Sequence, residues 1–390
     1  MKKFVRTVII ILIVGIVSGI IYQHIDEISD YSEKFIEQQI ARHYTDDFSQ
    51  YTPLSTFYFE NLSEIGKKAY IAIFNGIKEH SEKIDVPVLE DNSLNKIYSA
   101  IELDNPDLLC IPDSVTYVKQ GVRGYVEIKY TQSKSKCDEM TKELYDKVKE
   151  ISENISDTSS DFDKELYIHD YIVDSCQYVE TEHDDDAYGC LINGKAICSG
   201  YSEAFKILLN YNNIESELII GTGIDDEDGK IKHEWNTVKI NNNYYFTDVT
   251  WDDPLISDNN YYNKSHMYFN IDKDTLDIDH IDYNLPPSIT CGSIDSNYFV
   301  RRSLLYDVYD DNTKKAISND IFDCIGSGRK FVEFCFSNDS AYQTAVSRLF
   351  SNNGSDVGEI IYNMGYSDKF GRISYQTNDS HRYIKICFGQ

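Results

Sequence analysis

Three residues of the chain have the side-chain types of a nucleophile, a base and a group that orients the base. Cys198, His233 and Asp248 occur in this order within residues 186–254. A cysteine activated by a histidine, which a carboxylate in turn holds in place, is an arrangement used for covalent acyl transfer. Each of the three alone would more often be structural, because buried cysteines are usually inert. The interpretation therefore depends on the elements that position them.

Cys198 is predicted to stand at or near the start of a helix. Residues 194–197 lead into it, and after it apolar residues recur at helical spacing: Ala204, Phe205, Leu208 and Leu209. The first N–H groups of a helix have no partner within it, and the helix dipole is positive at this end. Both effects favour a negatively charged sulfur at Cys198.

His233 and Asp248 are predicted to lie on one β-hairpin. Alternating residues from 233 to 240 are followed by Asn241-Asn242 and a second run at 244–249, which is typical of two strands joined by a tight turn. A two-residue turn pairs Ile240 with Asn243 and puts position 248 opposite 235. Asp248 then becomes a diagonal neighbour of His233, about 7–8 Å away between backbones. A carboxylate at that place can reach an imidazole N–H.

Three segments around these residues resemble the signature blocks of the transglutaminase-like superfamily. They read AICSGY at 196–201, HEWNTV at 233–238 and YFTDVTWDDP at 245–254, and their order and spacing match as well. The resemblance covers about residues 160–283. The family often has Ala where this chain has Glu234, and Asp-Gly where this chain has Asn241-Asn242.

The resemblance implies a papain-like α+β core, in which a helix bearing Cys198 packs on an antiparallel sheet bearing His233 and Asp248. It also implies their roles as nucleophile, general base and orienter. The backbone N–H of Cys198 is expected to help hold an oxyanion, with Tyr188 as the candidate for a second donor. Trp235 and Trp251 are expected to form the walls of the cleft.

The composition excludes some partners. The 390 residues include 37 Lys and Arg against 65 Asp and Glu, so the formal net charge is −28. Basic residues form no run beyond the first six positions, which argues against nucleic acid as a partner. With 41% hydrophobic and 26% charged residues the chain is globular, and its length predicts two or three domains.

The N-terminus carries a targeting signal. Lys2, Lys3 and Arg6 precede an uncharged, mostly Ile and Val run at 7–23, and acidic residues follow it. Such a run is an uncleaved membrane anchor or a signal peptide, and both export the chain. The cleavage site around residues 17–19 is poor, so we favour an anchor with the catalytic region outside the cytoplasm. Secretion after cleavage is the alternative.

The nine cysteines leave the disulfide state open. Eight could pair while Cys198 stays free, or they could remain buried thiols. The sequence has no CxxC motif and no His/Cys cluster with zinc spacing, so it predicts neither a metal nor a cofactor.

Other polar motifs are interpreted as structural. His169 and Asp170 are adjacent on a predicted helix at 161–176 and should point about 100° apart. The runs at 183–186 and 225–229 are predicted to be acidic loops, and the second does not fit an EF-hand. Its position suggests that it overhangs the cleft.

These patterns predict five parts. They are a membrane anchor or signal segment (1–25), a stalk (26–52), an N-terminal α/β domain (53–157), the transglutaminase-like catalytic core (158–285) and a C-terminal α+β domain (286–390). The flanking domains carry no chemical motif.

The sequence therefore favours an exported cysteine enzyme that acts on amide bonds of peptides or proteins, which could be associated with the cell wall. Hydrolysis is favoured over cross-linking, because the acidic loops keep the cleft wet and because the chain lacks the β-sandwich domains of the animal cross-linking enzymes. The alternatives are a protein-glutamine transglutaminase and a non-catalytic cell-surface binding module.

Overall fold

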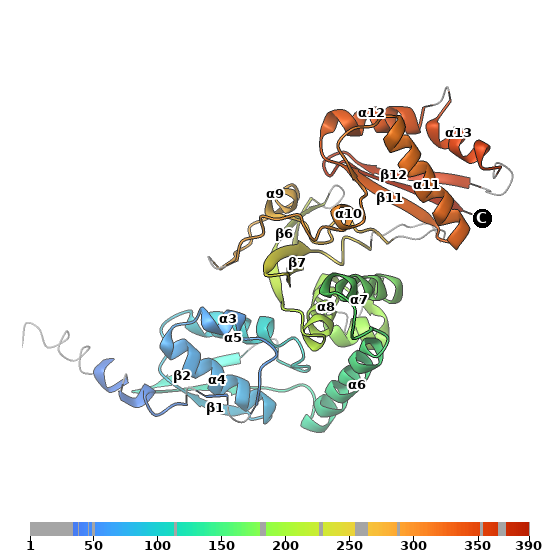
Figure 1. Cartoon of the computed structure of the whole chain (residues 1–390). Helices are drawn as coiled ribbons and strands as arrows, with labels where there is room; N and C mark the ends of the chain where they lie inside the picture. The colour runs from blue at the N-terminus through green and yellow to red at the C-terminus, as the bar shows by residue number, and fades with distance from the viewer. Residues whose placement is uncertain are drawn as a thin grey trace, which may run out of the picture. The chain divides into compact units, whose positions relative to one another are not determined.

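The computed structural model describes residues 34–37, 39–45, 47–48, 51–112, 115–179, 185–225, 229–253, 264–286, 289–351, 354–365 and 372–389. The chain forms two compact units, Met1–Asp138 and Glu139–Gln390 (Figure 1). The predicted membrane segment at 7–23 and most of the predicted stalk lie outside the described residues. Within the described ranges, no helix has both the length and the apolar character needed to cross a bilayer.

The first unit contains a small antiparallel sheet and the helices that cover it. Its elements are α3 (Phe57–Glu60), α4 (Glu64–Lys78), β1 (Lys83–Val86), α5 (Ser93–Asp104), β2 (Val115–Gln120) and β3 (Arg123–Ile128), with the strand order β1-β3-β2. The fully buried Asp104 accepts the backbone N–H groups of Tyr58 and Phe59. Asp104, the last residue of α5, therefore caps α3.

The second unit begins with helices and short strands that lead to the nucleophile. Helix α6 (Lys134–Ser152) continues into it from the first unit. It is followed by α7 (Asp161–Ser175), β4 (Gln177–Tyr178), the π-helical turn η1 (Gly189–Asn193), β5 (Lys195–Ala196) and α8 (Cys198–Tyr211). β4 and β5 pair in parallel. Gly194, with a φ of +68°, reverses the chain from η1 into β5, and α8 starts two residues after β5.

A four-stranded antiparallel sheet packs against α8. Its strands are β6 (Ser216–Asp225), β7 (Gly229–Ile240), β8 (Asn243–Thr247) and β9 (His280–Ile281), in the order β8-β7-β6-β9. The short helix α9 (Lys273–Leu276) precedes β9. Helix α8 buries Phe205, Leu208 and Leu209, which fall at the spacing that predicted the helix. The mixed α+β class of the core is as predicted.

The C-terminal part contains a second four-stranded sheet and its helices. The elements are α10 (Tyr298–Arg301), β10 (Leu305–Tyr306), α11 (Asp311–Ser327), β11 (Phe331–Phe336), α12 (Asp339–Leu349), α13 (Asp356–Asn363), β12 (Arg372–Asn378) and β13 (Tyr383–Gly389). The strand order is β10-β11-β13-β12, and only β10 runs parallel to its neighbour.

The two faces of this second sheet differ. Alternate residues on one face, including Phe334 and Ile386, pack against α11 and α12. The intervening positions present buried polar groups on the other face. There, Lys385 Nζ donates to the backbone oxygen of Lys264 at 2.7 Å, and Glu333 binds His266. The sheet is thus fixed to the core through polar contacts.

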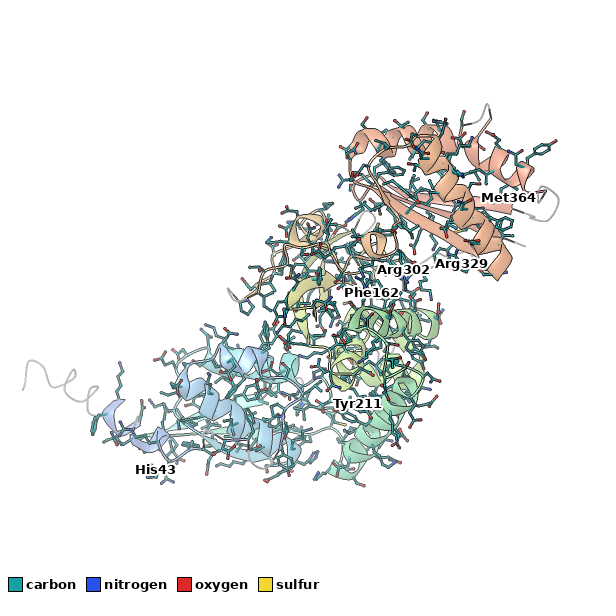
Figure 2. The ribbon with its side chains drawn as sticks, viewed as in Figure 1. His43, Phe162, Tyr211, Arg302, Arg329 and Met364 are labelled. Atoms are coloured by element: carbon teal, nitrogen blue, oxygen red, sulfur yellow. The ribbon has the colours of Figure 1, made fainter. Side chains whose placement is uncertain are left out.

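A second contact joins α7 to the segment around α10. The ring of Phe162 lies under the guanidinium groups of Arg301 and Arg302, at 5.1 and 5.5 Å from the ring centre. Figure 2 shows Phe162 and Arg302 side by side. This contact holds the N-terminal end of α7 against the C-terminal part.

Candidate active site

The hairpin that carries His233 has the predicted register. Ile240 pairs with Asn243 and Asn236 with Thr247. Asn241 and Asn242 both have positive φ values, 50° and 67°, as a type I′ turn requires. β8 ends at Thr247, so Asp248 is the first residue beyond the strand.

His233 and Asp248 form a buried pair. His233 Nε2 lies 2.6 Å from Asp248 Oδ2, and the two side chains are 2% and 1% exposed. The other carboxylate oxygen, Oδ1, accepts the backbone N–H groups of Thr250 and Trp251 at 3.0 and 3.1 Å. The carboxylate is therefore fixed in place and directs one imidazole nitrogen, which leaves Nδ1 of His233 available to another group.

Cys198 supplies that other group. It is the first residue of α8, and the preceding Ile197 is extended and makes no side-chain cap bond. Burial disfavours a charged His233, but the charge and hydrogen bond of Asp248, together with the Cys198 side chain, raise the pKa of His233 to about 10. The imidazole therefore holds a proton strongly and lies within hydrogen-bonding reach of the sulfur. It is placed to accept the thiol proton and to return it to a leaving group.

A second histidine, His280, binds the same carboxylate and was missed by the sequence analysis. His280 Nε2 lies 3.1 Å from Asp248 Oδ2, and its Nδ1 lies 2.7 Å from Asp279. Asp279 in turn contacts His381 at 2.7 Å and accepts the hydroxyl of Tyr268 at 2.7 Å. Burial opposes charge on His280, but the two carboxylates raise its pKa. A chain of hydrogen bonds therefore leads from Asp248 to the loop between β12 and β13.

The two tryptophans occupy different places. Trp251 is partly exposed and stacks on His233, with 4.9 Å between ring centres and an interplanar angle of 25°. Trp235 is 0% exposed and lies behind His233, so the prediction that it forms a wall of the cleft is wrong. Strand alternation put both His233 and Trp235 on one face, but the rings of His280 and Tyr283 pack on Trp235, at 4.7 and 5.4 Å between ring centres. The Tyr188 hydroxyl donates to Glu143 on α6 at 2.5 Å, so here it is directed to α6 rather than held for an oxyanion.

Two glycines of β6 make room for these rings. A Cβ at Gly221 would lie 2.5 Å from Trp235, and one at Gly223 would lie 2.7 Å from Trp251. Both distances are shorter than real contacts, so a side chain there would displace the indoles. The packing around His233 thus depends on two backbone positions without side chains.

A family comparison agrees with this geometry. A model of the transglutaminase-like superfamily matches residues 146–249. Residues 146–249 are a transglutaminase-like core. The matched range contains Cys198, His233 and Asp248. No curated protein matches the chain.

Solved structures give only partial likenesses. A candidate cysteine protease from Cytophaga hutchinsonii is 11% identical, with a TM-score of 0.24 over 36% of this chain and 62% of its own. A TGase is 11% identical, with a TM-score of 0.26 over 47% of this chain and 53% of its own. A candidate protease from Parabacteroides distasonis is 12% identical, with a TM-score of 0.23 over 35% of each chain. The chain thus covers less than two thirds of each of these structures.

Glu234, which stands where the family often has Ala, faces away from His233. Its carboxylate accepts the hydroxyl of Ser202 on α8 at 2.6 Å. Glu203, one residue further along α8, accepts the N–H of Ala187 at 3.1 Å. Burial and the charge of Glu234 raise the pKa of Glu203 well above its usual range. The two carboxylates therefore connect α8 to β7 and to the segment before η1. Neither of these hydrogen bonds involves a residue of the triad.

The predicted acidic loops of the core are only partly described. Residues 180–184 and 226–228 lie outside the described ranges, so the expected overhang at the cleft stays a prediction. Asp186 accepts the N–H of Gly189 at 2.8 Å and thereby supports η1. Cys198 is a free thiol and is partly exposed.

Proposed function

We propose that the chain is a cysteine acyl-transfer enzyme acting on amide bonds of peptides or proteins. The observation that carries the proposal is the 2.6 Å contact between His233 and Asp248, with Cys198 at the start of α8 within reach of the same imidazole. The transglutaminase-like core around these residues supports the reaction class.

The reaction would proceed through a thioester. The Cys198 thiol gives its proton to His233 Nδ1 as the sulfur attacks the amide carbonyl carbon, and the backbone N–H of Cys198 stabilises the oxyanion. His233 donates its Nδ1 proton to the departing amine while Asp248 holds the ring in place. An acceptor then attacks the thioester carbonyl, His233 takes the acceptor's proton, and the sulfur leaves.

We favour water over an amine as that acceptor. The acidic runs at 184–186 and 225–228, which are predicted to be loops near the cleft, support a hydrated entrance, and the chain as a whole has a formal net charge of −28. The same charge attracts cationic peptides and lysine side chains, and this supports transamidation as the second candidate.

The proposal also includes a location. The apolar run at 7–23 with its basic flank supports a single-pass membrane protein whose catalytic part lies outside the cytoplasm. Protease added to intact cells should then degrade the catalytic part. Full protection in cells with a single membrane would contradict this location.

The acceptor can be tested with the purified full-length chain. A glutamine-containing peptide and an excess of a labelled primary amine are supplied together, and free acid, ammonia and amine adduct are measured by mass spectrometry. We expect mainly free acid from the wild type and from Cys137→Ala, a control at a partly buried cysteine on α6, and no product from Cys198→Ala. Mainly amine adduct would favour transamidation. No turnover of any peptide amide would favour a binding module.

A further inference from the structure

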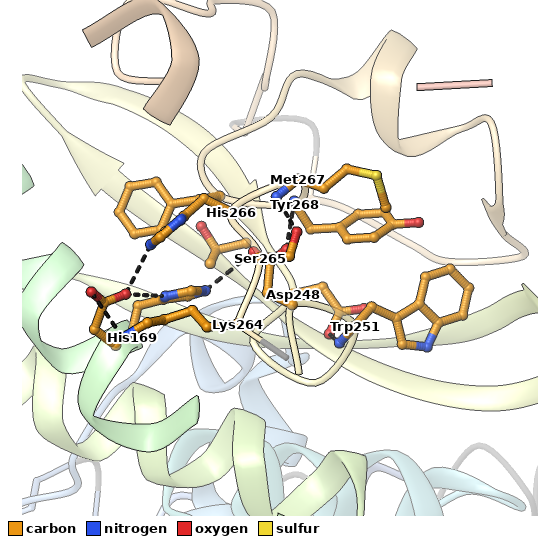
Figure 3. Close-up of polar contacts among 12 residues, drawn as sticks. His169, Asp248, Trp251, Lys264, Ser265, His266, Met267 and Tyr268 are labelled. Carbon is orange, nitrogen blue, oxygen red and sulfur yellow. Dashed lines mark hydrogen bonds and ion pairs between the residues drawn. The ribbon is translucent and has the colours of Figure 1, made fainter. Parts of the chain in front are cut away.

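A second cluster of His and Asp residues lies outside the triad. His266 Nε2 and His169 Nδ1 lie 2.8 and 3.2 Å from the same oxygen, Oδ1 of Asp170. The three potential ligand atoms all lie within 4.8 Å of one another. His169, Lys264 and His266 lie together in Figure 3, apart from Asp248 and Trp251. We call His169, Asp170 and His266 the second cluster.

Each imidazole of the second cluster also contacts a carboxylate that is not part of the cluster. His169 Nε2 lies 3.1 Å from Asp252 Oδ2, and His266 Nδ1 lies 2.5 Å from Glu333 Oε1. The ring of Tyr298 also stacks on His266 at 3.9 Å and nearly parallel. A buried carboxylate on the far nitrogen is the usual support of a metal-binding histidine, because it fixes both the tautomer and the ring orientation.

The second cluster is open to solvent on one side only. The histidine side chains are 0% and 5% exposed, whereas the Asp170 side chain is 34% exposed. Asp170 and His266 line a cavity of about 770 Å³, together with Lys264 and Glu333. An ion could enter from this cavity, and a position opposite the protein ligands would remain for water.

We propose that His169, Asp170 and His266 bind a divalent transition metal ion of the Zn²⁺ type. Two imidazoles and one carboxylate are the ligand set of a zinc site with an open position, whereas Mg²⁺ and Ca²⁺ prefer oxygen ligands. Ligand atoms at about 2.1 Å from a tetrahedral ion are roughly 3.4 Å apart. The observed 2.8 and 3.2 Å therefore need only a small expansion of the cluster. Sequence spacing could not predict this site, because His266 comes 96 residues after Asp170.

Lys264 forms an ion pair with the other carboxylate oxygen of Asp170. Its Nζ lies 3.2 Å from Asp170 Oδ2 and 2.6 Å from Asp174 Oδ2. Binding through Oδ1 alone leaves this ion pair intact, but the ammonium charge opposes a nearby dication. Replacing Lys264 by an uncharged residue should therefore strengthen metal binding.

The ion would connect three parts of the second unit. His169 and Asp170 belong to α7, His266 follows the core hairpin, and Glu333 belongs to β11 of the C-terminal sheet. Asp252, which holds His169, also donates its backbone N–H to the carbonyl of Asp248 at 3.2 Å. An ion bound to the folded chain alone also stabilises it by mass action.

The test is zinc binding to the full-length chain after removal of metals with EDTA. Calorimetry with ZnCl₂, and absorption spectra with CoCl₂, would report the stoichiometry and the affinity. We expect one ion per chain in the wild type, an affinity at least about tenfold weaker in Asp170→Asn, and several-fold tighter in Lys264→Met. Thermal unfolding should move to higher temperature with Zn²⁺ in the wild type, and by less in Asp170→Asn at the same Zn²⁺ concentration.

Cys198→Ala separates this site from the triad, whose thiol and imidazole could also bind zinc. We expect its affinity to equal that of the wild type. Binding that is lost in Cys198→Ala and kept in Asp170→Asn would overturn the proposal, and so would the absence of binding to the wild type. If Asp170→Asn does not fold, Lys264→Met decides: unchanged or weaker binding overturns the proposal.

Discussion

The triad and the second cluster use the same residue types for different purposes. In each, one carboxylate lies between two imidazoles: Asp248 between His233 and His280, and Asp170 between His169 and His266. Asp248 is 1% exposed and its other oxygen is saturated by backbone N–H groups. Asp170 is 34% exposed, and its other oxygen contacts only a flexible ammonium in the bonds described.

This difference teaches that the surroundings of a carboxylate decide its chemistry. A buried carboxylate with fixed partners can orient a base but has no room for a ligand. A carboxylate at the edge of a cavity can exchange its partner for an ion. The following predictions separate the two roles.

Exchanging each carboxylate for an amide should affect a different property: turnover at Asp248 and zinc affinity at Asp170. Asp248→Asn should lower kcat/KM by about 10³–10⁴-fold, because an amide no longer fixes the imidazole tautomer or stabilises its charge. Its zinc affinity should stay within about threefold of the wild type. Asp170→Asn should lose zinc affinity and, with EDTA present, lose less than about tenfold in turnover. Similar losses of turnover in both variants would show that the two clusters are not separate.

The pH dependence of kcat/KM should report the raised pKa of His233. The imidazolium that donates the proton to the leaving amine persists up to about pH 10, so activity should fall only as the pH approaches this value. The same raised pKa stabilises the folded state below about pH 6.5, and this contribution disappears as the pH rises through the folded-state pKa. Circular dichroism at each pH therefore serves as the control. An alkaline limb between pH 6 and 8 in a folded protein would contradict the assignment.

His280 should matter less than Asp248, because it positions the carboxylate and is not part of the triad itself. Replacing it by Leu removes its hydrogen bonds to Asp248 and Asp279. The loss at Asp248 should cost about 1.5 kcal/mol, or about tenfold in kcat. His280→Gln keeps an N–H donor and should retain most activity. Equal losses in both variants, or a change in KM alone, would speak against a positioning role.

The smallest effect is expected at Glu165, which lies between the two clusters. It is on α7, one turn before His169, and accepts hydrogen bonds from Thr247 and Asn270 at 3.3 and 2.7 Å. Burial raises its pKa to about 8, so the folded state binds more protons than the unfolded state between about pH 4.5 and 8. Stability should therefore fall across this window in the wild type. At pH 8, the free energy of unfolding of Glu165→Gln should exceed that of the wild type by at least about 1 kcal/mol, measured by urea unfolding, and at pH 4 the two should differ little. An equal pH dependence of stability in both proteins would contradict the raised pKa of Glu165.

The local parts of the site could be predicted from the sequence. The Asn241-Asn242 turn sets the hairpin register, and the register alone puts Asp248 beside His233. The apolar spacing after Cys198 likewise sets the start of α8. Both depend on residues close in sequence, where backbone preferences decide the geometry.

The long-range parts could not be predicted in this way. His280 reaches Asp248 because β9 pairs with β6, and Trp235 is buried because that same pairing covers it. His169 and Asp170 leave the helix in different directions, but Nδ1 of the imidazole still lies 3.2 Å from the carboxylate. In each case the partner comes from another element of the fold. The predicted domain limits and the N-terminal anchor remain predictions.

The most direct test of the account is the alkylation rate of Cys198 at pH 6 with iodoacetamide, followed site by site with peptide mass spectrometry. An ordinary thiol, with a pKa of about 8.5, is less than about 1% ionised at this pH. The account predicts that Cys198 reacts at least about tenfold faster than Cys137, and that His233→Ala removes the difference. Equal rates at Cys198 and Cys137 in the wild type would contradict the claim that Cys198, His233 and Asp248 form an activated nucleophile.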